Sequence, residues 1–217
     1  MYKTVVFDLD GTLLNTLTDL ADAGNRLCQK YGWPTHERQA YRYFVGNGIP
    51  KLVERLAPAD QRTPAVLEAA LADFKRDYGQ HLRDTTAPYP GIPEMLAKLK
   101  ANGVQLAVFS NKADALAKEV VKDYFGTQYF TIVRGQMTGV APKPAAEGTN
   151  ALLQALHADP ASTLYVGDSN VDVETAHNAN LPCCGAVWGF RTREELNAAG
   201  AEYLSENSDE LYDVIMK

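Results

Sequence analysis

The chain has 217 residues, which is enough for a substantial hydrophobic core and for a core domain that carries a smaller inserted one. Hydrophobic residues make up 46% of the sequence and charged residues 22%, the balance of an ordinary globular protein. The formal net charge of −6 and the lack of any basic run argue against a nucleic-acid-binding surface. An anionic substrate stays possible, because a few local cations or a metal can outweigh a weak overall field.

The first predicted strand ends in two carboxylates. The stretch VVFDLDGTLLNT, which begins at residue 5, places Asp8 and Asp10 two positions apart after an apolar run, and Gly11 and Thr12 follow directly. A turn with a solvated end would explain this pair. A charged ligand, and above all a metal that needs both carboxylates, would explain it as well.

Residues 16–86 show helical patterns and no convincing strand. The clearest patterns are LTDLADAGNRLCQKYG and TPAVLEAALADFKRDYGQHL, and the segment ends in the Pro-rich stretch TTAPYPG. We therefore predict an all-helical cap domain over residues 16–86, inserted after the first strand into a core domain made of residues 1–15 and 87–217.

The rest of the chain alternates between short apolar runs and helical segments. The apolar runs are VQLAVFS, YFTIV, TLYVGD and CCGAVW, and the segments between them include PEMLAKLKANG and ADALAKEVVKDYFG. This alternation predicts an α/β fold with a Rossmann-like parallel sheet and helices on both faces. A last helix is predicted over SDELYDVIMK, with Ser208 as its N-cap.

The cysteines do not indicate a disulfide framework or a zinc site. There are three, Cys28, Cys183 and Cys184, and two of them are adjacent. The sequence also has no signal-peptide pattern and no apolar run long enough to span a membrane. We therefore expect a reducing, cytoplasmic setting.

Polar residues gather where the predicted strands end, and ligands of open parallel sheets bind beyond those ends. Besides the first pair these residues are Ser110, Asn111 and Asp168, and Lys143 lies in a loop before a helix. Each alone is often a helix cap, a turn residue or a solvated lysine. Several acidic groups together raise one another's pKa unless a cation binds between them, and Mg²⁺ suits such oxygen ligands. The set therefore predicts metal-assisted phosphoryl transfer, with an aspartate able to attack phosphorus.

Four stretches in this order resemble the ordered motifs of the haloacid dehalogenase-like hydrolase superfamily. They are FDLDGTLLNT, SNK, the lysine of PKP, and GDSNVDVETA, and together they span most of the chain. The helical insert is similar to the small α-helical cap of the superfamily. Partly through YRYFVGNGIPKLVERL, the chain most resembles the phosphoglycolate phosphatase-like group.

The resemblance implies roles for four aspartates. Asp8 matches the nucleophile, which is also a ligand of Mg²⁺. Asp10 matches the general acid/base, whose backbone carbonyl also contacts the metal. Asp168 matches the acidic metal ligand, and Asp172 matches the second acid of the last motif, which supports the metal site rather than binding the ion directly.

The resemblance also implies which residues bind phosphate: Gly11, Thr12, Ser110, Asn111 and Lys143. Lys143 would in addition screen the charge of the nucleophile from the incoming phosphate. The second aspartate of the first motif favours phosphate chemistry over carbon–halogen cleavage, because an alkoxide leaving group needs a proton and a halide does not. Asn15 departs from the family pattern, which often has Asp there, and its role at the first cap hinge stays open.

The Gly-rich stretch FVGNGIPK in the insert is the candidate for a substrate-facing loop. Arg42 and Lys51 would pair with a substrate carboxylate, and Asn47 would donate a hydrogen bond. Each has an ordinary alternative, since Arg42 is equally consistent with a solvated side chain and Lys51 with a first-turn helix residue.

We thus expect a Mg²⁺-dependent phosphatase for a small phosphate monoester, with phosphoglycolate as the leading candidate. The alternatives are a β-phosphoglucomutase-like phosphosugar mutase, a pyrophosphatase, and a non-catalytic binding protein on the same scaffold. The expected partner is a small phosphorylated substrate, without nucleic acid or membrane, and the chain is expected to be a monomer or a homodimer.

Overall fold

The computed structural model describes residues 1–217, which divide into two compact units. The first unit, the core unit, consists of Met1–Leu14 and Pro88–Lys217. The second unit, the helical insert, is Asn15–Ala87. No helix in the structure has both the length and the apolar character needed to cross a membrane.

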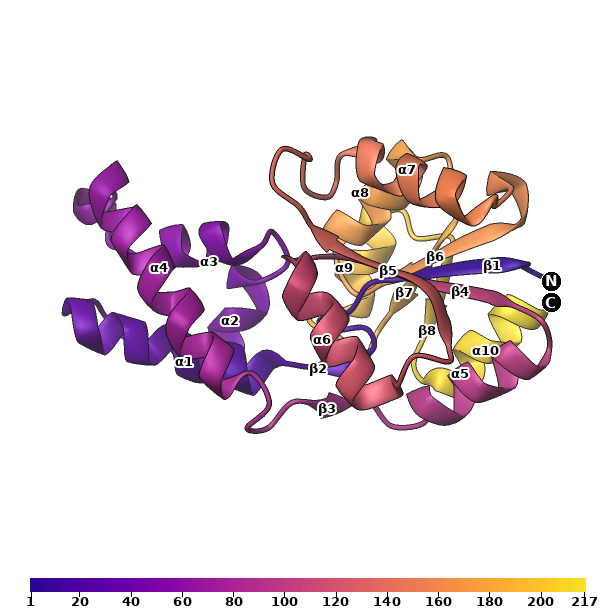
Figure 1. Cartoon of the computed structure of the whole chain (residues 1–217), viewed down its shortest axis with the longest axis horizontal. Coiled ribbons are helices and arrows are strands. Elements are labelled where there is room, and N and C mark those ends of the chain that lie inside the picture. Colours follow the sequence, from indigo (N-terminus) through magenta and orange to yellow (C-terminus); the bar gives the residue numbers. More distant parts are fainter. The chain divides into compact units, whose positions relative to one another are not determined.

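The core unit is built on a six-stranded sheet with the order β5-β4-β1-β6-β7-β8, in which all neighbours are parallel (Figure 1). Numbered by their order along the chain, these strands follow the 3-2-1-4-5-6 arrangement of doubly wound folds. Every residue of β1, β6 and β7 is buried, because helices cover both faces. The strands are β1 (Thr4–Phe7), β4 (Gln105–Ala113), β5 (Phe130–Gln136), β6 (Thr163–Gly167), β7 (Cys183–Ala186) and β8 (Tyr203–Ser205).

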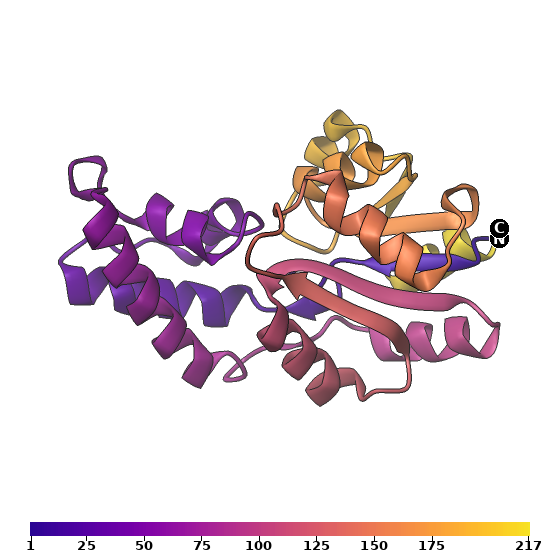
Figure 2. The ribbon, with the colours of Figure 1, turned by 45° about the horizontal axis from the view of Figure 1, so that its top comes forward.

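Six helices flank this sheet, and Figures 1 and 2 show α5 and α6 on one face and α7 and α8 on the other. They are α5 (Ile92–Ala101), α6 (Asp114–Phe125), α7 (Ala146–Leu156), α8 (Asn170–Asn178), α9 (Arg193–Ala199) and α10 (Ser208–Met216), and a 3₁₀ turn covers Pro160–Ser162. The chain ends lie side by side, since the Tyr2 amide donates to the Ile215 carbonyl at 2.9 Å.

The insert is helical, and aromatic side chains fill its interior. Tyr41, Phe74 and Tyr78 are fully buried, and the rings of the last two lie 5.7 Å apart. Its helices are α1 (Leu17–Tyr31), α2 (Arg38–Phe44), α3 (Ile49–Leu56) and α4 (Pro64–His81), with a 3₁₀ turn at Ala59–Gln61. The short strands β2 (Leu14–Asn15) and β3 (Ala87–Pro88) pair where the chain leaves and re-enters the core unit.

The predicted fold class is confirmed, with a parallel sheet, flanking helices and a helical segment after the first strand. Two local predictions are corrected. The edge strand β8 was not expected, because three residues are too short to show a pattern. The N-cap of α10 is Asn207 rather than Ser208: the Asn207 side chain accepts from the Asp209 and Glu210 amides at 3.1 and 3.0 Å.

Candidate active site

The carboxylates of the site meet because β1 and β6 are neighbours. Phe7 at the end of β1 pairs with Val166 of β6, so Asp8 and Asp168 follow the ends of adjacent strands. Asp172 lies in the first turn of α8, directly after β6. One carboxylate oxygen from each of the three aspartates lies within 4.8 Å of the others, and all three residues are buried.

The turn after β1 packs closely against Asp168. Gly11 has φ +91°, and a Cβ there would overlap the Asp168 carboxylate. Thr12 donates its hydroxyl to Asp168 Oδ1 at 3.1 Å, and the Phe190 amide donates to Asp168 Oδ2 at 2.7 Å. Burial raises the pKa of Asp168 well above its ordinary range, and the charges of Asp172 and Asp8 add to this effect.

Lys143 is the cation at the centre of the cluster. Its Nζ lies 2.7 Å from Asp172 Oδ1 and 2.9 Å from Asp8 Oδ1, and its side chain is only 2% exposed. Burial alone would lower the pKa of Lys143, but Asp172 and Asp8 outweigh it and hold that pKa well above its ordinary value. The lysine is therefore an ammonium group between two carboxylates.

Asp8 combines burial with close contact to an ammonium group. Asp8 Oδ1 is buried, and the group that lies against it is the ammonium of Lys143, 2.9 Å away. Burial raises the pKa of Asp8 to about 7, Lys143 opposes the rise, and Asp172 adds to it. A desolvated carboxylate beside an ammonium group suits either metal binding or attack on phosphorus.

Asp172 differs, because both of its oxygens are engaged within the protein. Oδ1 contacts Lys143, and Oδ2 accepts from the Ser169 amide at 3.1 Å and from its hydroxyl at 2.7 Å, which forms the capping box of α8. These contacts fit the expected supporting role of Asp172, which stays a prediction.

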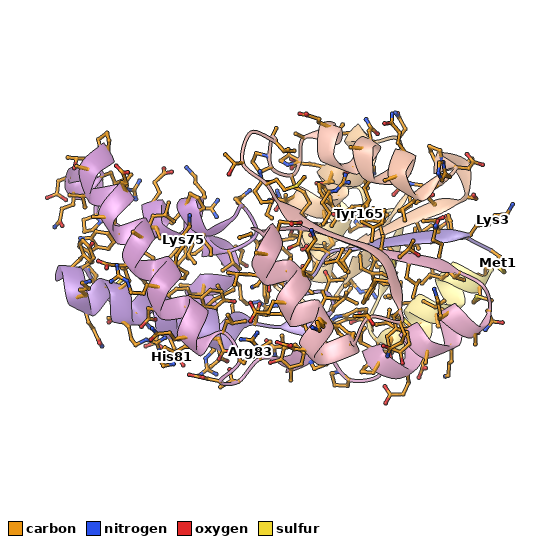
Figure 3. All side chains as sticks on the ribbon, viewed as in Figure 1. Met1, Lys3, Lys75, His81, Arg83 and Tyr165 are labelled. Atoms are coloured by element: carbon orange, nitrogen blue, oxygen red, sulfur yellow. The ribbon has the colours of Figure 1, made fainter.

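The loop that carries Lys143 is held by Asn111. The Asn111 side chain accepts from the Lys143 amide at 2.8 Å and donates to its carbonyl at 3.2 Å. The side-chain amide of Asn111 therefore positions the backbone of Lys143. The expected contact of Asn111 with phosphate stays a prediction. Tyr165, which the sequence reasoning did not single out, places its hydroxyl 3.3 Å from Lys143 Nζ and lies in the interior of the core unit (Figure 3).

The end of β4 brings three consecutive polar residues into buried positions. Ser110, Asn111 and Lys112 are all buried, as are the residues of the neighbouring strand β1, because both faces of the sheet are covered. The register of β4 against β5 shifts between Phe109 and Ala113, and this irregularity re-aims the side chains. The Lys112 amide donates to Ser110 Oγ at 3.2 Å, so the hydroxyl proton of Ser110 is available to another acceptor.

Lys112 is the main site residue that the sequence reasoning missed. Its Nζ lies 3.1 and 3.2 Å from the two oxygens of Asp10, whose side chain is 20% exposed. In the sequence, Lys112 is only a charged residue at the end of an apolar strand, in the stretch SNK. That position does not indicate that Asp10, 102 positions away, is its partner.

The charges of the cluster fit a divalent cation. The four carboxyl groups of Asp8, Asp10, Asp168 and Asp172 outnumber the ammonium groups of Lys112 and Lys143, and a bound cation would favour the charged forms of Asp8 and Asp168, whose pKa values burial raises. The donors are hard oxygens, and one of them, Asp8 Oδ1, is buried. The residues present therefore fit a metal of the Mg²⁺ type.

Two of the three candidate residues of the insert make side-chain contacts within the insert. Asn47 accepts from Arg55 Nη2 at 2.9 Å, and Lys51 pairs with Glu54 at 2.7 Å on one turn of α3. Arg42 lies in the last turn of α2. Their role in substrate selection stays a prediction.

Comparison with known proteins agrees with this geometry. The sequence profile described as "Haloacid dehalogenase-like hydrolase" matches residues 5–186. A protein of Chromobacterium violaceum named phosphoglycolate phosphatase is 31% identical over 216 residues, covering 98% of this chain and 96% of its own. A protein of the same name from Thiobacillus denitrificans is 31% identical over 87% of this chain and 84% of its own. A crystal structure from Lactobacillus delbrueckii subsp. bulgaricus superimposes with a TM-score of 0.93 at 28% identity, covering 99% of this chain and 98% of that one.

Proposed function

Because the chain belongs to the haloacid dehalogenase-like hydrolase family and is a phosphatase, we propose that it hydrolyses phosphoglycolate with Mg²⁺, through a phosphoryl group carried on Asp8. The observation that carries this proposal is the buried oxygen of Asp8, held beside the ammonium group of Lys143.

In the first step, an oxygen of Asp8 forms a bond to phosphorus while the ester P–O bond breaks, and Asp10 gives its proton to the departing alkoxide. In the second step, Asp10 takes a proton from water, whose oxygen attacks phosphorus and releases Asp8 and inorganic phosphate. The two roles need two carboxylates in different surroundings, and Asp8 is buried whereas Asp10 is partly exposed.

The cations and donors of the site hold the phosphate. Lys143 reduces the repulsion between the Asp8 carboxylate and the dianionic substrate, and Ser110 supplies a hydrogen bond. The amides of Gly11 and Thr12 donate to the carbonyls of Leu14 and Leu9 at 2.8 and 3.3 Å, so they would bind phosphate only if these bonds opened. The carboxylates of Asp8 and Asp168 and the backbone carbonyl of Asp10 would hold Mg²⁺, and Asp172 would support this site. When bound, the ion supplies electrostatic stabilisation of the charge that develops on the phosphoryl oxygens.

Phosphoglycolate is proposed from the relatives that carry its name. Its carboxylate would be recognised by the cations and the amide of the insert, Arg42, Lys51 and Asn47. We also propose that the protein works in the cytoplasm, because Cys28, Cys183 and Cys184 are all free thiols.

The test is a Mg²⁺-dependent phosphatase assay across phosphoglycolate, sugar phosphates, nucleotides and pyrophosphate, with isomer formation from a hexose phosphate followed in parallel. We expect phosphate release with the highest kcat/KM on phosphoglycolate, and loss of at least about 10³-fold in Asp8→Asn. Full activity of that variant would refute the role of Asp8. A higher kcat/KM on another ester would refute the substrate alone.

A further inference from the structure

The site contains a second buried lysine, and it pairs with the other catalytic carboxylate. Lys143 lies against Asp8, while Lys112 Nζ lies 3.1 and 3.2 Å from the two oxygens of Asp10. The side chain of Lys112 is 3% exposed, so its charge is removed from water almost completely. An ammonium group is costly to bury, and the contact with both oxygens of one carboxylate offsets that cost.

The backbone fixes where this lysine points. Lys112 lies at the irregular end of β4, and its amide is bonded to Ser110 Oγ. Its carbonyl is packed so closely against β5 that a Cβ on Gly135 would overlap it. Gly135 is held in turn by its amide, which donates to Asp114 Oδ1 at 3.0 Å. The lysine therefore extends from a rigid anchor, which is what a positioning role requires.

Asp10 needs such a support. It lies in the turn after β1, its side chain is partly exposed, and Lys112 contacts both of its oxygens. We propose that Lys112 is a positioning residue for Asp10: it orients the carboxylate toward the leaving oxygen of the substrate. This inference rests on the proposed function and adds the residue that makes its acid/base step efficient.

Loss of a positioning lysine should affect two kinds of substrate differently, whereas general destabilisation of the protein should affect both equally. In the first step the P–O bond breaks as Asp10 transfers its proton to the leaving oxygen. An alkyl phosphate such as phosphoglycolate depends on that proton, because an alkoxide is a poor leaving group. p-Nitrophenyl phosphate depends on it much less, because nitrophenolate leaves without protonation. The value of kcat/KM covers events only up to the release of the alcohol, so it isolates this step.

The experiment is a double-mutant cycle with Lys112→Met, Asp10→Asn and the double variant, assayed on both substrates. General acid catalysis contributes about 10²- to 10⁴-fold, so we expect Lys112→Met to lower kcat/KM on the alkyl phosphate by about 10²-fold. On p-nitrophenyl phosphate the loss should stay below about tenfold. The double variant should be no worse than Asp10→Asn alone, and Lys112→Arg should recover most of the activity because its guanidinium can contact both oxygens.

Lys30→Met is the matched control. Lys30 pairs with Asp73 of the insert at 2.7 Å, and its side chain is 56% exposed. Its removal should leave both substrates unaffected.

Three results would overturn the proposal: equal losses on the two substrates, multiplicative losses in the double variant, or a rise in KM without a fall in kcat. If Lys112→Met does not fold, Lys112→Gln replaces it in the cycle, and failure of both to fold would make the lysine structural. A wild-type protein without phosphatase activity would refute the proposed function itself. If the wild type is active, Asp8→Asn is inactive and Lys112→Met is unaffected, only the role of Lys112 is refuted.

Discussion

Lysine–aspartate pairs occur in both units, but those of the active site and those of the insert lie in opposite surroundings. In the core unit, Lys143 and Asp172 are 2.7 Å apart with side chains 2% and 1% exposed. In the insert, Lys30 and Asp73 are also 2.7 Å apart, but the lysine is 56% exposed. Water screens the second pair and not the first, so equal distances carry very different energies. Burying Lys143 and Asp172 costs the free energy of removing two charges from water, and a role in catalysis explains why the pair is present.

The largest expected effect comes from the centre of the buried cluster. Replacing Lys143 by Met removes the cation between Asp8 and Asp172 and leaves their repulsion with the substrate uncompensated. We expect kcat/KM in saturating Mg²⁺ to fall by about 10²- to 10³-fold, as for loss of a preorganised electrostatic donor. Circular dichroism and thermal unfolding of the same sample separate this effect from loss of folding. A loss below about tenfold would place the lysine outside the catalytic machinery.

The second effect concerns a buried charge in the insert. Asp19 is 2% exposed and accepts four hydrogen bonds, from the amides and hydroxyls of Thr85 and Thr86, at 2.5 to 2.9 Å. In Asp19→Ala these donors lose their acceptor, and we expect the free energy of unfolding to fall by about 2–4 kcal/mol. The exposed Asp22 on the same helix is the control, and its replacement by Ala should change stability by less than about 0.5 kcal/mol. Equal effects of the two substitutions would contradict the importance of burial.

The third effect is the pH dependence of stabilisation by Mg²⁺. Burial raises the pKa of Asp8 from 3.8 to about 7, so without metal this group favours the folded state fully below pH 4 and loses that contribution as the pH rises through 7. The charged form is the one that binds a cation. We therefore expect Mg²⁺ to raise Tm by a few degrees more at pH 8 than at pH 5.5, at constant ionic strength. The difference should shrink in Asp8→Asn, and an unchanged difference would assign the effect to other groups.

The smallest effect should come from the exposed pairs of the insert. Arg26 and Asp77 are 2.6 Å apart, with side chains 38% and 34% exposed. Arg26→Met should lower the free energy of unfolding by no more than about 1 kcal/mol, measured by urea unfolding. A loss above about 2 kcal/mol would show that distance matters more than burial for the ion pairs of this protein.

The sequence by itself determined the fold class and the positions of the chemistry. The alternation of buried strands with helices is local, and so are the turn DGT after β1 and the capping box of Ser169 and Asp172, because each depends on residues a few positions apart. Parallel strands place their carboxyl ends at one edge, so the pattern puts Asp8 and Asp168 at the same edge, and the adjacency of β1 and β6 brings them together.

Only the tertiary structure decided which side chains support these groups. The pairing of Lys112 with Asp10 spans 102 positions and depends on an irregular register between β4 and β5. The contact of Tyr165 with Lys143 depends on which side of β6 faces the loop. Neither leaves a local pattern, because the free energy of a buried charge is set by neighbours that are distant in the chain. The site residues were therefore visible in the sequence, and the lysine that holds Asp10 became visible only when the strands were assembled.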